Sequence, residues 1–452
     1  FFNMIDRHHG VWDELKTPNG GIGVGGNADR VSSLQECVRS YASICDSNLM
    51  RTLAGQVLTR LGTSVKSVYE DQKHTREVVT LLAVCVPIIS SLDNAESETL
   101  FNILSTVVLR DKFAILQKRA YSCLVTLCSR EQALPQSLLN SMYQLLQTSL
   151  VTCAPSAKRP RLACLQAFME SSRLQDRKYA ESVAQLLGEV LLCTKDSNRR
   201  TRELAFAVIV SMVRALPTGD VRNTGPITKA ELMQMAAAAL ATATAHMRSA
   251  ALQGLAVILY EIHSSEMVSE TKELDSTSSA LGFELLDAVL VLLQEKSREV
   301  VKSVLGFLKV AITVIPAQKL LPLVPRIVQG ILNWSKDAKN RFRLKVRVLI
   351  ERLIRKLGAD AIEPYVPKKD KALVSYILKE RARVIRKKNR RKDAGDEMDV
   401  EREEQEKEED REEEDDDESD EEWVRSMVGS SSSGMKQWIK SDGGDLLDKT
   451  TS

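Results

Sequence analysis

A short motif that recurs along the chain constrains its fold more than any other feature. In each occurrence an arginine opens a run of small and aliphatic residues, as in Arg119-Ala-Tyr-Ser-Cys-Leu and Arg248-Ser-Ala-Ala-Leu. Repeats of about 40–50 residues indicate stacked helical units, because one helix pair cannot bury its apolar face alone. The arginines are Arg119, Arg161, Arg202, Arg248, Arg298 and Arg343, which lie 42, 41, 46, 50 and 45 residues apart.

The residues around these arginines have helical periodicity. From residue 31 to about 358, apolar side chains recur at positions i, i+3, i+4 and i+7, and no segment alternates in the manner of a strand with a turn signal. Aromatic residues make up only 5% of the chain, which is typical of cores built from Leu, Val, Ala and Ile on stacked helices. The sequence therefore predicts an all-α solenoid of HEAT or armadillo-like repeats.

Charge is distributed very unevenly along the chain. Residues 396–422 contain 20 acidic and 3 basic side chains (net −17), and residues 423–452 contain 4 basic and 3 acidic ones (net +1). Since the whole chain carries +2, residues 1–395 carry +2 + 17 − 1 = +18. A basic body beside an acidic tail favours a polyanionic partner, most often a nucleic acid, although a solvated basic surface has the same composition.

Composition also divides the chain into four predicted segments. Residues 1–30 contain a glycine-rich run without the lysine and strand of a phosphate-binding loop, so we interpret them as a flexible linker. Residues 31–358 form the predicted solenoid. Residues 359–392 follow a proline-containing boundary as a basic helical extension. Residues 393–452 are too charged in their first half to build a core, and we expect a disordered acidic tail.

No motif for catalysis or for a cofactor is present. The sequence lacks a phosphate-binding G-x-x-x-x-G-K-[ST], the zinc-protease H-E-x-x-H and the hydrolase G-x-S-x-G, so we expect no enzyme, no catalytic residue and no cofactor. The eight cysteines have no C-x-x-C spacing and mostly fall in apolar helical patterns, which favours reduced core thiols and no metal site. No apolar run reaches the roughly 18 residues of a membrane span, so no membrane partner is expected. Because the chain begins with Phe1 rather than Met, we also expect further sequence upstream.

Two basic segments are the candidate contacts for a nucleic acid. In residues 336–356 an apolar helical stripe is surrounded by Lys and Arg, and the helix predicted for residues 371–392 ends in a dense basic cluster. Such clusters bind phosphates, but they also serve as nuclear localisation signals, and both interpretations stay open. The candidate RNA-binding residues are Lys339, Arg341, Arg343, Lys345, Arg347, Arg381, Arg383, Arg386, Lys387, Lys388, Arg390, Arg391 and Lys392. In the tail, Ser419 precedes Asp-Glu-Glu and is a candidate phosphorylation site.

The C-terminal third resembles a known family. Five features follow one another in the same order as in the ribosomal RNA-processing protein twelve family. They are the basic run from Arg341 to Gly358, the step Tyr365-Val-Pro, the helix around Leu378-Lys-Glu-Arg-Ala-Arg, the acidic tail and the motif that starts at Trp438. The specific resemblance covers about residues 335–450, while the helical repeats before them agree with the family in kind.

This resemblance implies a nuclear and nucleolar HEAT-repeat protein that is similar to karyopherins. It implies preribosomal RNA and ribosome assembly factors as partners, a role in pre-rRNA processing, and export of ribosomal subunits with Ran GTPase and the export machinery. The alternative is a karyopherin-like transport or protein-interaction scaffold that does not bind RNA directly. In that case the basic cluster acts only as a localisation signal.

Overall fold

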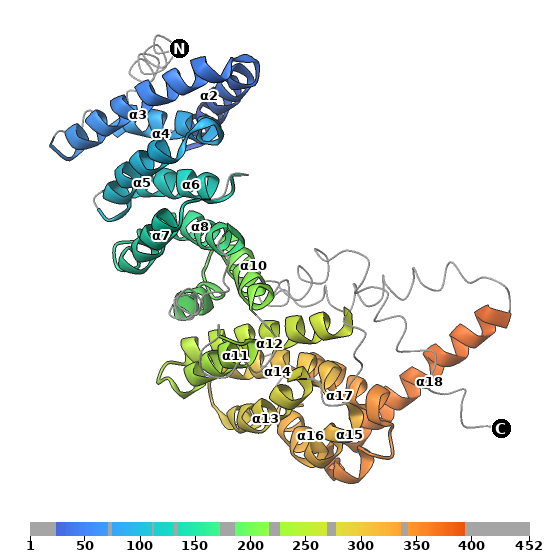
Figure 1. Cartoon of the computed structure of the whole chain (residues 1–452). Coiled ribbons are helices and arrows are strands. Elements are labelled where there is room, and N and C mark those ends of the chain that lie inside the picture. The colour runs from blue at the N-terminus through green and yellow to red at the C-terminus, as the bar shows by residue number, and fades with distance from the viewer. Residues whose placement is uncertain are drawn as a thin grey trace, which may run out of the picture. The chain divides into compact units, whose positions relative to one another are not determined.

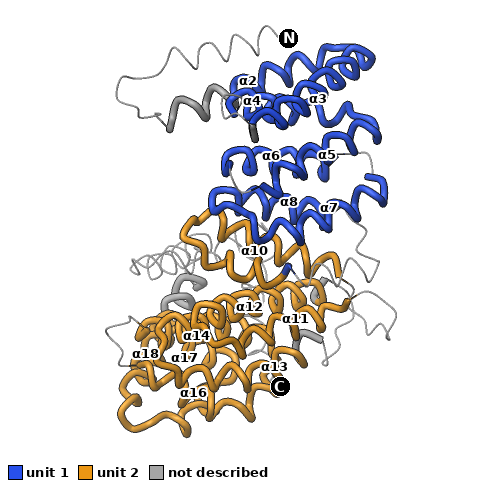
Figure 2. Tube along the Cα trace, turned by 90° about the vertical axis from the view of Figure 1, so that its left-hand side faces the viewer, with its two compact units in different colours: residues 1–186, 223–226 blue, residues 187–222, 227–452 orange. Residues whose placement is uncertain are grey.

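The structure is a computed structural model of the chain, and it describes residues 24–70, 75–110, 113–130, 134–171, 186–216, 227–268, 277–335 and 342–393. In these segments the regular secondary structure is helical, with no β-strand. The chain divides into two compact units (Figure 2), residues 1–186 with 223–226 and residues 187–222 with 227–452. The predicted all-α solenoid class is confirmed.

In unit 1 the helices form two layers (Figure 1). Helices α2, α4, α6 and α8 pack one on the next, and α3 and α5 pack beside them, with α3 contacting both α4 and α5. The helices are α2 (Val24–Ile44), α3 (Ser47–Glu70), α4 (Thr75–Ile88), α5 (Asn94–Val108), α6 (Ala114–Cys128), α7 (Gln136–Thr148) and α8 (Lys158–Ser171), with short 3₁₀ helices η2 (Ile89–Ser91) and η3 (Pro155–Ala157).

Unit 2 repeats the same arrangement. Its helices α10, α12, α14 and α17 pack in succession, and α11, α13 and α16 form the second layer. The helices are α10 (Arg199–Ala215), α11 (Lys229–Ala238), α12 (Ala245–Val268), α13 (Thr277–Val291), α14 (Arg298–Val314), α15 (Ala317–Leu320), α16 (Val324–Leu332), α17 (Phe342–Leu357) and α18 (Lys371–Asp393). The 3₁₀ helices are η4 (Ala239–Ala241), η5 (Leu292–Gln294), η6 (Leu321–Leu323), η7 (Glu363–Tyr365) and η8 (Lys368–Asp370).

The repeated arginines fall in helices that pack in succession within each unit. They lie near the starts of α6, α8, α10, α12, α14 and α17, in that order, so the period read from the sequence is the period of the stacked helices. Within each unit, successive helices of this set pack on one another through small and aliphatic side chains. Ala205 and Ile209 of α10 and Ala251 and Leu255 of α12 are 0% exposed, for example. The repeat is thus a repeat of core-forming helices.

Local signals start several of the helices. The side chain of Asp93 accepts a hydrogen bond from the Glu96 backbone at 2.8 Å, and the Glu96 carboxylate accepts one from the Asp93 backbone at 3.0 Å. Thr228 and Glu231 form the same capping box at the start of α11. These pairs satisfy amide groups that have no partner within the helix. Polar breaks between apolar runs therefore act as helix starts.

The segment boundaries differ from the prediction at one end. Helix α2 begins at Val24, inside the region interpreted as a linker up to residue 30. A glycine costs a helix only about 1 kcal/mol, and a helix that already buries Leu34 and Val38 extends backward through Gly25 and Gly26. Helix α18 occupies most of the predicted basic extension, and the acidic tail from residue 394 lies outside the described residues.

Candidate nucleic-acid interface

Helix α17 docks on unit 2 through the apolar stripe that the sequence indicated. Phe342, Val346, Leu349, Ile350, Leu353 and Ile354 are all buried, with exposures of at most 2%. Phe342 also meets Trp334 edge to face, with ring centroids 5.5 Å apart, and the Trp334 indole donates to the Leu293 carbonyl at 3.0 Å. The stripe is fully used by the fold, so only the other sides of α17 are open to a partner.

The cations of α17 have different roles. Arg343 and Arg355 are exposed, and Arg355 lies 3.7 Å from the Glu351 carboxylate one turn earlier. Lys356 instead donates to the carbonyls of Ile312 and Thr313 at 2.6 and 2.9 Å. These carbonyls belong to the last turn of α14, where a helix has unsatisfied acceptors and a partial negative charge. Lys356 therefore joins two helices of unit 2 and is not presented outward.

A glycine ends α17 and turns the chain toward α18. Gly358 has φ +89°, a left-handed conformation that favours glycine because it has no Cβ atom. Its amide donates to the Ile354 carbonyl at 3.0 Å, which closes the last turn of the helix.

An arginine of α17 and two apolar residues of α18 fix the position of α18. The Arg347 guanidinium donates to the Glu380 carboxylate at 3.0 Å and lies 4.8 Å from the centre of the Tyr376 ring. Val374 and Ile377, on the side of α18 that packs inward, are 3% and 2% exposed. Arg347 was predicted to contact RNA, and here it contributes by positioning the first half of α18.

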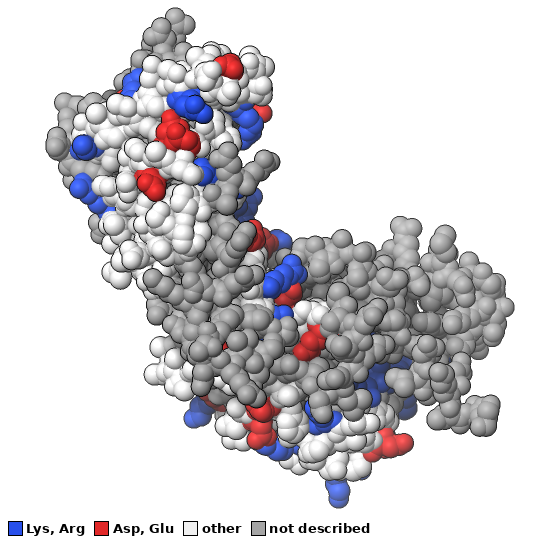
Figure 3. Space-filling view, viewed as in Figure 1, with Lys and Arg blue, Asp and Glu red and all other residues white. Residues whose placement is uncertain are grey.

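The outward side of α18 is basic. Lys379, Arg383 and Arg386 are exposed and stand four and three residues apart, which places them on one face of the helix. We call these three residues the α18 basic face. The only acidic residue between positions 371 and 386 is Glu380, whose carboxylate is bonded to Arg347. In Figure 3, blue side chains are visible beside the start of this helix.

The structure describes only some of the predicted contacts. Lys339 and Arg341 and the tail residue Ser419 lie outside the described residues. Lys345 and Arg381 are half-buried, whereas Arg383 and Arg386 are exposed. Lys387, Lys388, Arg390, Arg391 and Lys392 belong to α18, but their side chains are not among those described.

Lys379 was absent from the predicted set, although its spacing to Arg383 and Arg386 would have revealed it. The whole set of RNA contacts stays a prediction.

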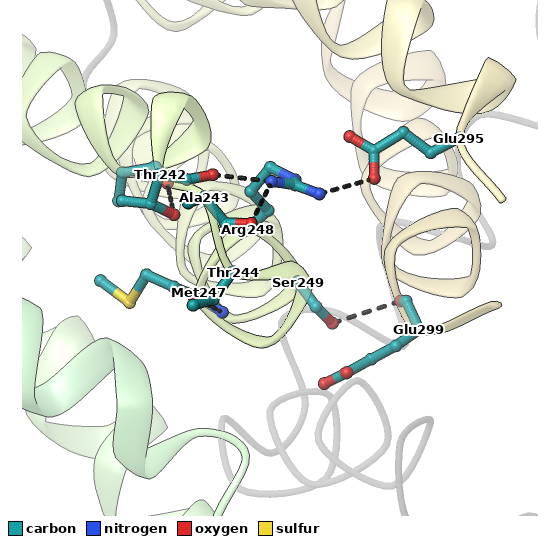
Figure 4. A network of polar contacts seen from close by, with 9 residues as sticks. Thr242, Ala243, Thr244, Met247, Arg248, Ser249, Glu295 and Glu299 are labelled. Carbon is teal, nitrogen blue, oxygen red and sulfur yellow. Dashed lines mark hydrogen bonds and ion pairs between the residues drawn. The ribbon is translucent and has the colours of Figure 1, made fainter. Parts of the chain in front are cut away.

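The repeated arginines act within the protein. Arg248 donates through Nη1 to the carbonyls of Thr242 and Ala243 at 2.7 and 3.1 Å and through Nη2 to Glu295 at 3.0 Å (Figure 4). Next to it, the Ser249 hydroxyl contacts the Glu299 carbonyl at 3.2 Å. Arg202 of the preceding repeat bonds the carbonyls five and six residues before it in the same manner. These arginines fasten the turn before each helix.

One repeated arginine is completely enclosed in unit 1. Arg161 is 2% exposed and donates to the Tyr121 hydroxyl at 3.1 Å, the Ser149 hydroxyl at 2.6 Å and the Leu146 carbonyl at 2.5 Å. Its guanidinium also lies 6.0 Å from the centre of the Tyr121 ring. The buried charge is satisfied by the end of α7 and by α6, so it organises the core.

Other kinds of site receive no support from the described residues. No three His, Cys, Asp or Glu side chains of these segments are grouped so that they could hold a metal ion. No helix among them is long and apolar enough to cross a membrane. The cysteines are free thiols, and five of them, Cys85, Cys123, Cys128, Cys164 and Cys193, are buried. Burial raises the pKa of Cys85 to about 12, which keeps this thiol protonated and unreactive.

Comparison with known proteins finds relatives of this chain. No protein-family model matches the chain. Ribosomal RNA-processing protein 12 of Saccharomyces cerevisiae is 28% identical over 380 residues, which cover 80% of this chain and 29% of that protein. The RRP12-like protein of Homo sapiens is 30% identical over 358 residues, covering 78% of this chain and 25% of that protein.

The solved structures that match the chain are more distant in sequence. A mutant of Kap121p is 12% identical with a TM-score of 0.47, and the match covers 76% of this chain and 37% of that one. An archaeal HEAT-like repeats protein from Thermococcus onnurineus NA1 is 13% identical with a TM-score of 0.31, covering 63% and 98%.

The curated relatives extend well beyond the region they share with this chain, which spans about 25–30% of the length of the yeast, fission yeast and human proteins. The resemblance found in the C-terminal third is confirmed by alignments that cover most of the chain. Over about four-fifths of its own length, the chain is a homologue of the ribosomal RNA-processing protein 12 family.

Proposed function

We propose that this chain is a non-enzymatic scaffold in ribosome biogenesis that binds preribosomal RNA through the α18 basic face. The names of its relatives supply the process, ribosomal RNA processing. The observation that carries the binding is the exposed row of Lys379, Arg383 and Arg386 on a helix that the solenoid holds in place. Ribosome assembly factors and a nuclear, nucleolar location belong to the same proposal. Contacts with Ran GTPase and the export machinery stay predictions.

The chemistry of the face suits a phosphate backbone. Cations that neutralise phosphates release condensed counterions, so their contribution to affinity is large, independent of base sequence and weakened by salt. The described part of α18 offers no exposed aromatic residue beyond Tyr376, which packs against Arg347. Stacking on unpaired bases is therefore a minor contribution. The binding is dominated by the RNA backbone and has weak sequence preference.

The proposal is tested by charge reversal on α18. The variant Lys379→Glu/Arg383→Glu/Arg386→Glu is expected to bind a pre-rRNA fragment at least tenfold more weakly at 0.1 M salt. Its slope of log affinity against log salt should fall by about three, roughly one for each lost phosphate contact. Binding is measured by fluorescence anisotropy across a salt series, and circular dichroism checks that the helix content is unchanged.

A matched control variant has the same change of net charge at three exposed positions outside α18. Lys118, Arg200 and Lys296 are exposed on other helices and turns, so Lys118→Glu/Arg200→Glu/Lys296→Glu should retain most of the affinity and of the salt slope. Equal losses in the two variants would mean that RNA responds only to total charge. No loss in the α18 variant would place RNA binding on another surface. Either result contradicts the proposal.

A further inference from the structure

The apolar side of α18 is covered over only half of its described length. Val374 and Ile377 are 3% and 2% exposed, but Val384 and Ile385 are 43% and 48% exposed. Val384 and Ile385 stand ten and eleven positions after Val374, close to three full turns of 3.6 residues. Val384 and Ile385 therefore lie on the same side of α18 as Val374 and Ile377, but the rest of unit 2 does not cover them. We call Val384 and Ile385 the open stripe.

The open stripe also has a charge that restricts its partner. Arg381 lies between Ile377 and Val384 on the same side of the helix, four residues after the first and three before the second. It is half-buried, so a segment that covers the open stripe meets a guanidinium at its edge. A suitable occupant has apolar side chains for Val384 and Ile385 and carboxylates for Arg381 and the flanking basic residues.

One segment of this chain has that chemistry. Every residue from 412 to 422 except Ser419 is acidic, and Trp423, Val424, Met427 and Val428 follow directly. The spacing i, i+1, i+4, i+5 places these four apolar residues on one side if the segment becomes helical on binding. The tail has two other apolar pairs. Trp438-Ile439 has Lys436 and Lys440 on its two sides, and Leu446-Leu447 has only the single carboxylates of Asp445 and Asp448 beside it and no acidic run. Charge complementarity therefore selects residues 412–428.

The connection to α18 is long enough. Nineteen positions separate Asp393, the last residue of α18, from residue 412, and an extended chain spans up to about 3.3 Å for each of them. Ile385 lies eight residues before Asp393, about 12 Å back along the helix. The segment can thus return along α18 without strain. We propose that residues 412–428 dock on the open stripe of α18 within the same molecule, with their carboxylates on Arg381 and its basic neighbours.

Photo-crosslinking in the full chain tests this docking without RNA. With p-benzoylphenylalanine in place of Ile385, irradiation of the monomer is expected to join position 385 to residues 412–428 of the same chain, as identified by mass spectrometry. The variant Trp423→Ser/Val424→Ser should lose at least four-fifths of this product. Its matched control, Trp438→Ser/Ile439→Ser, should keep it. Crosslinks to other segments, or between two chains, would overturn the proposal.

Because the crosslinker replaces a stripe residue, a second measurement uses the natural helix. Hydrogen exchange of backbone amides in residues 380–393 is expected to be at least threefold slower in the unmodified chain than in Trp423→Ser/Val424→Ser. Equal exchange in the two proteins at low salt would contradict docking. Exchange that differs at low salt and becomes equal only at high salt would support the electrostatic part of the docking. Neither measurement involves RNA, so failure of the proposed RNA binding leaves the result intact.

Discussion

At the scale of the residue, we expect the half-buried side chain of His263 to couple the stability of unit 2 to pH. Burial lowers the pKa of this imidazole, Glu266 opposes the shift, and Lys356 adds to it. The unfolded chain then binds a proton near pH 6.5 that the folded chain accepts only at lower pH. Stability contributed by His263 is therefore present above the unfolded pKa and decreases as the pH falls from about 6.5 toward the folded value.

The variant His263→Gln removes this proton linkage, since glutamine stays neutral. Between pH 7 and pH 5 we expect the unmodified chain to lose stability more steeply than the variant. The difference in slope cannot exceed about 1.4 kcal/mol per pH unit, the value for one proton. Urea unfolding at the two pH values measures it. Parallel losses in the two proteins would show that other groups cause the whole pH dependence.

At the scale of the element, helices α10 and α12 are each fastened to the turn before them. Arg248 and Arg202 bond two carbonyls of the turns that precede α12 and α10, and Arg248 adds an ion pair to Glu295 near the start of α14. In a solenoid, stability is close to a sum of repeat and neighbour contributions. The contacts of Arg248 therefore contribute twice, once to the stability of its own repeat and once to the interface with the next repeat.

We expect Arg248→Ala to destabilise unit 2 by about 1.5–3 kcal/mol, the range for hydrogen bonds to a charged group, because two carbonyls and Glu295 lose their donor. Arg248→Lys should recover less than half, since an ammonium group lacks the planar fork that reaches all three acceptors. Urea unfolding of the variants measures both changes. Arg200→Ala, at an exposed position of α10, is the control and should stay within about 0.5 kcal/mol. Full recovery by lysine would mean that charge alone matters.

At the scale of the whole molecule, a body of charge +18 is joined to a run of −17. Opposite charges on one chain have a high effective concentration for each other, and the Debye length at physiological salt, about 8 Å, leaves close contacts unscreened. We therefore expect an RNA that binds the α18 basic face to compete with the tail of the same protein.

Removal of residues 394–452 is expected to raise the affinity for a pre-rRNA fragment about tenfold at 0.1 M salt. The advantage should shrink toward zero near 0.5 M salt, because screening weakens the competing tail. Anisotropy titrations of the two proteins over a salt series measure this. If the truncated chain binds no more tightly at any salt concentration, the tail does not compete with RNA.

The fold could be predicted in large part from the sequence because its signals are local. The arginine period identified the helices α6, α8, α10, α12, α14 and α17, and the apolar stripe of α17 was predicted from the spacing in residues 336–356. Both follow from helical periodicity, which depends only on neighbours within a few turns. The start of α2 was predicted less well, since glycine content indicated a linker where packing of Leu34 and Val38 favours a helix.

The sequence alone thus determined that the chain is a stack of helices with a basic end and an acidic tail. Only the tertiary structure decided what each cation does. Arg161 is enclosed by α6 and α7, Lys356 joins α14, and Arg347 holds α18, whereas Lys379, Arg383 and Arg386 remain exposed. In sequence these residues are equivalent basic positions on amphipathic helices. Their roles differ because most of their partners lie 15–44 residues away in the sequence. A pattern that depends on neighbours within a few turns of helix cannot predict such contacts.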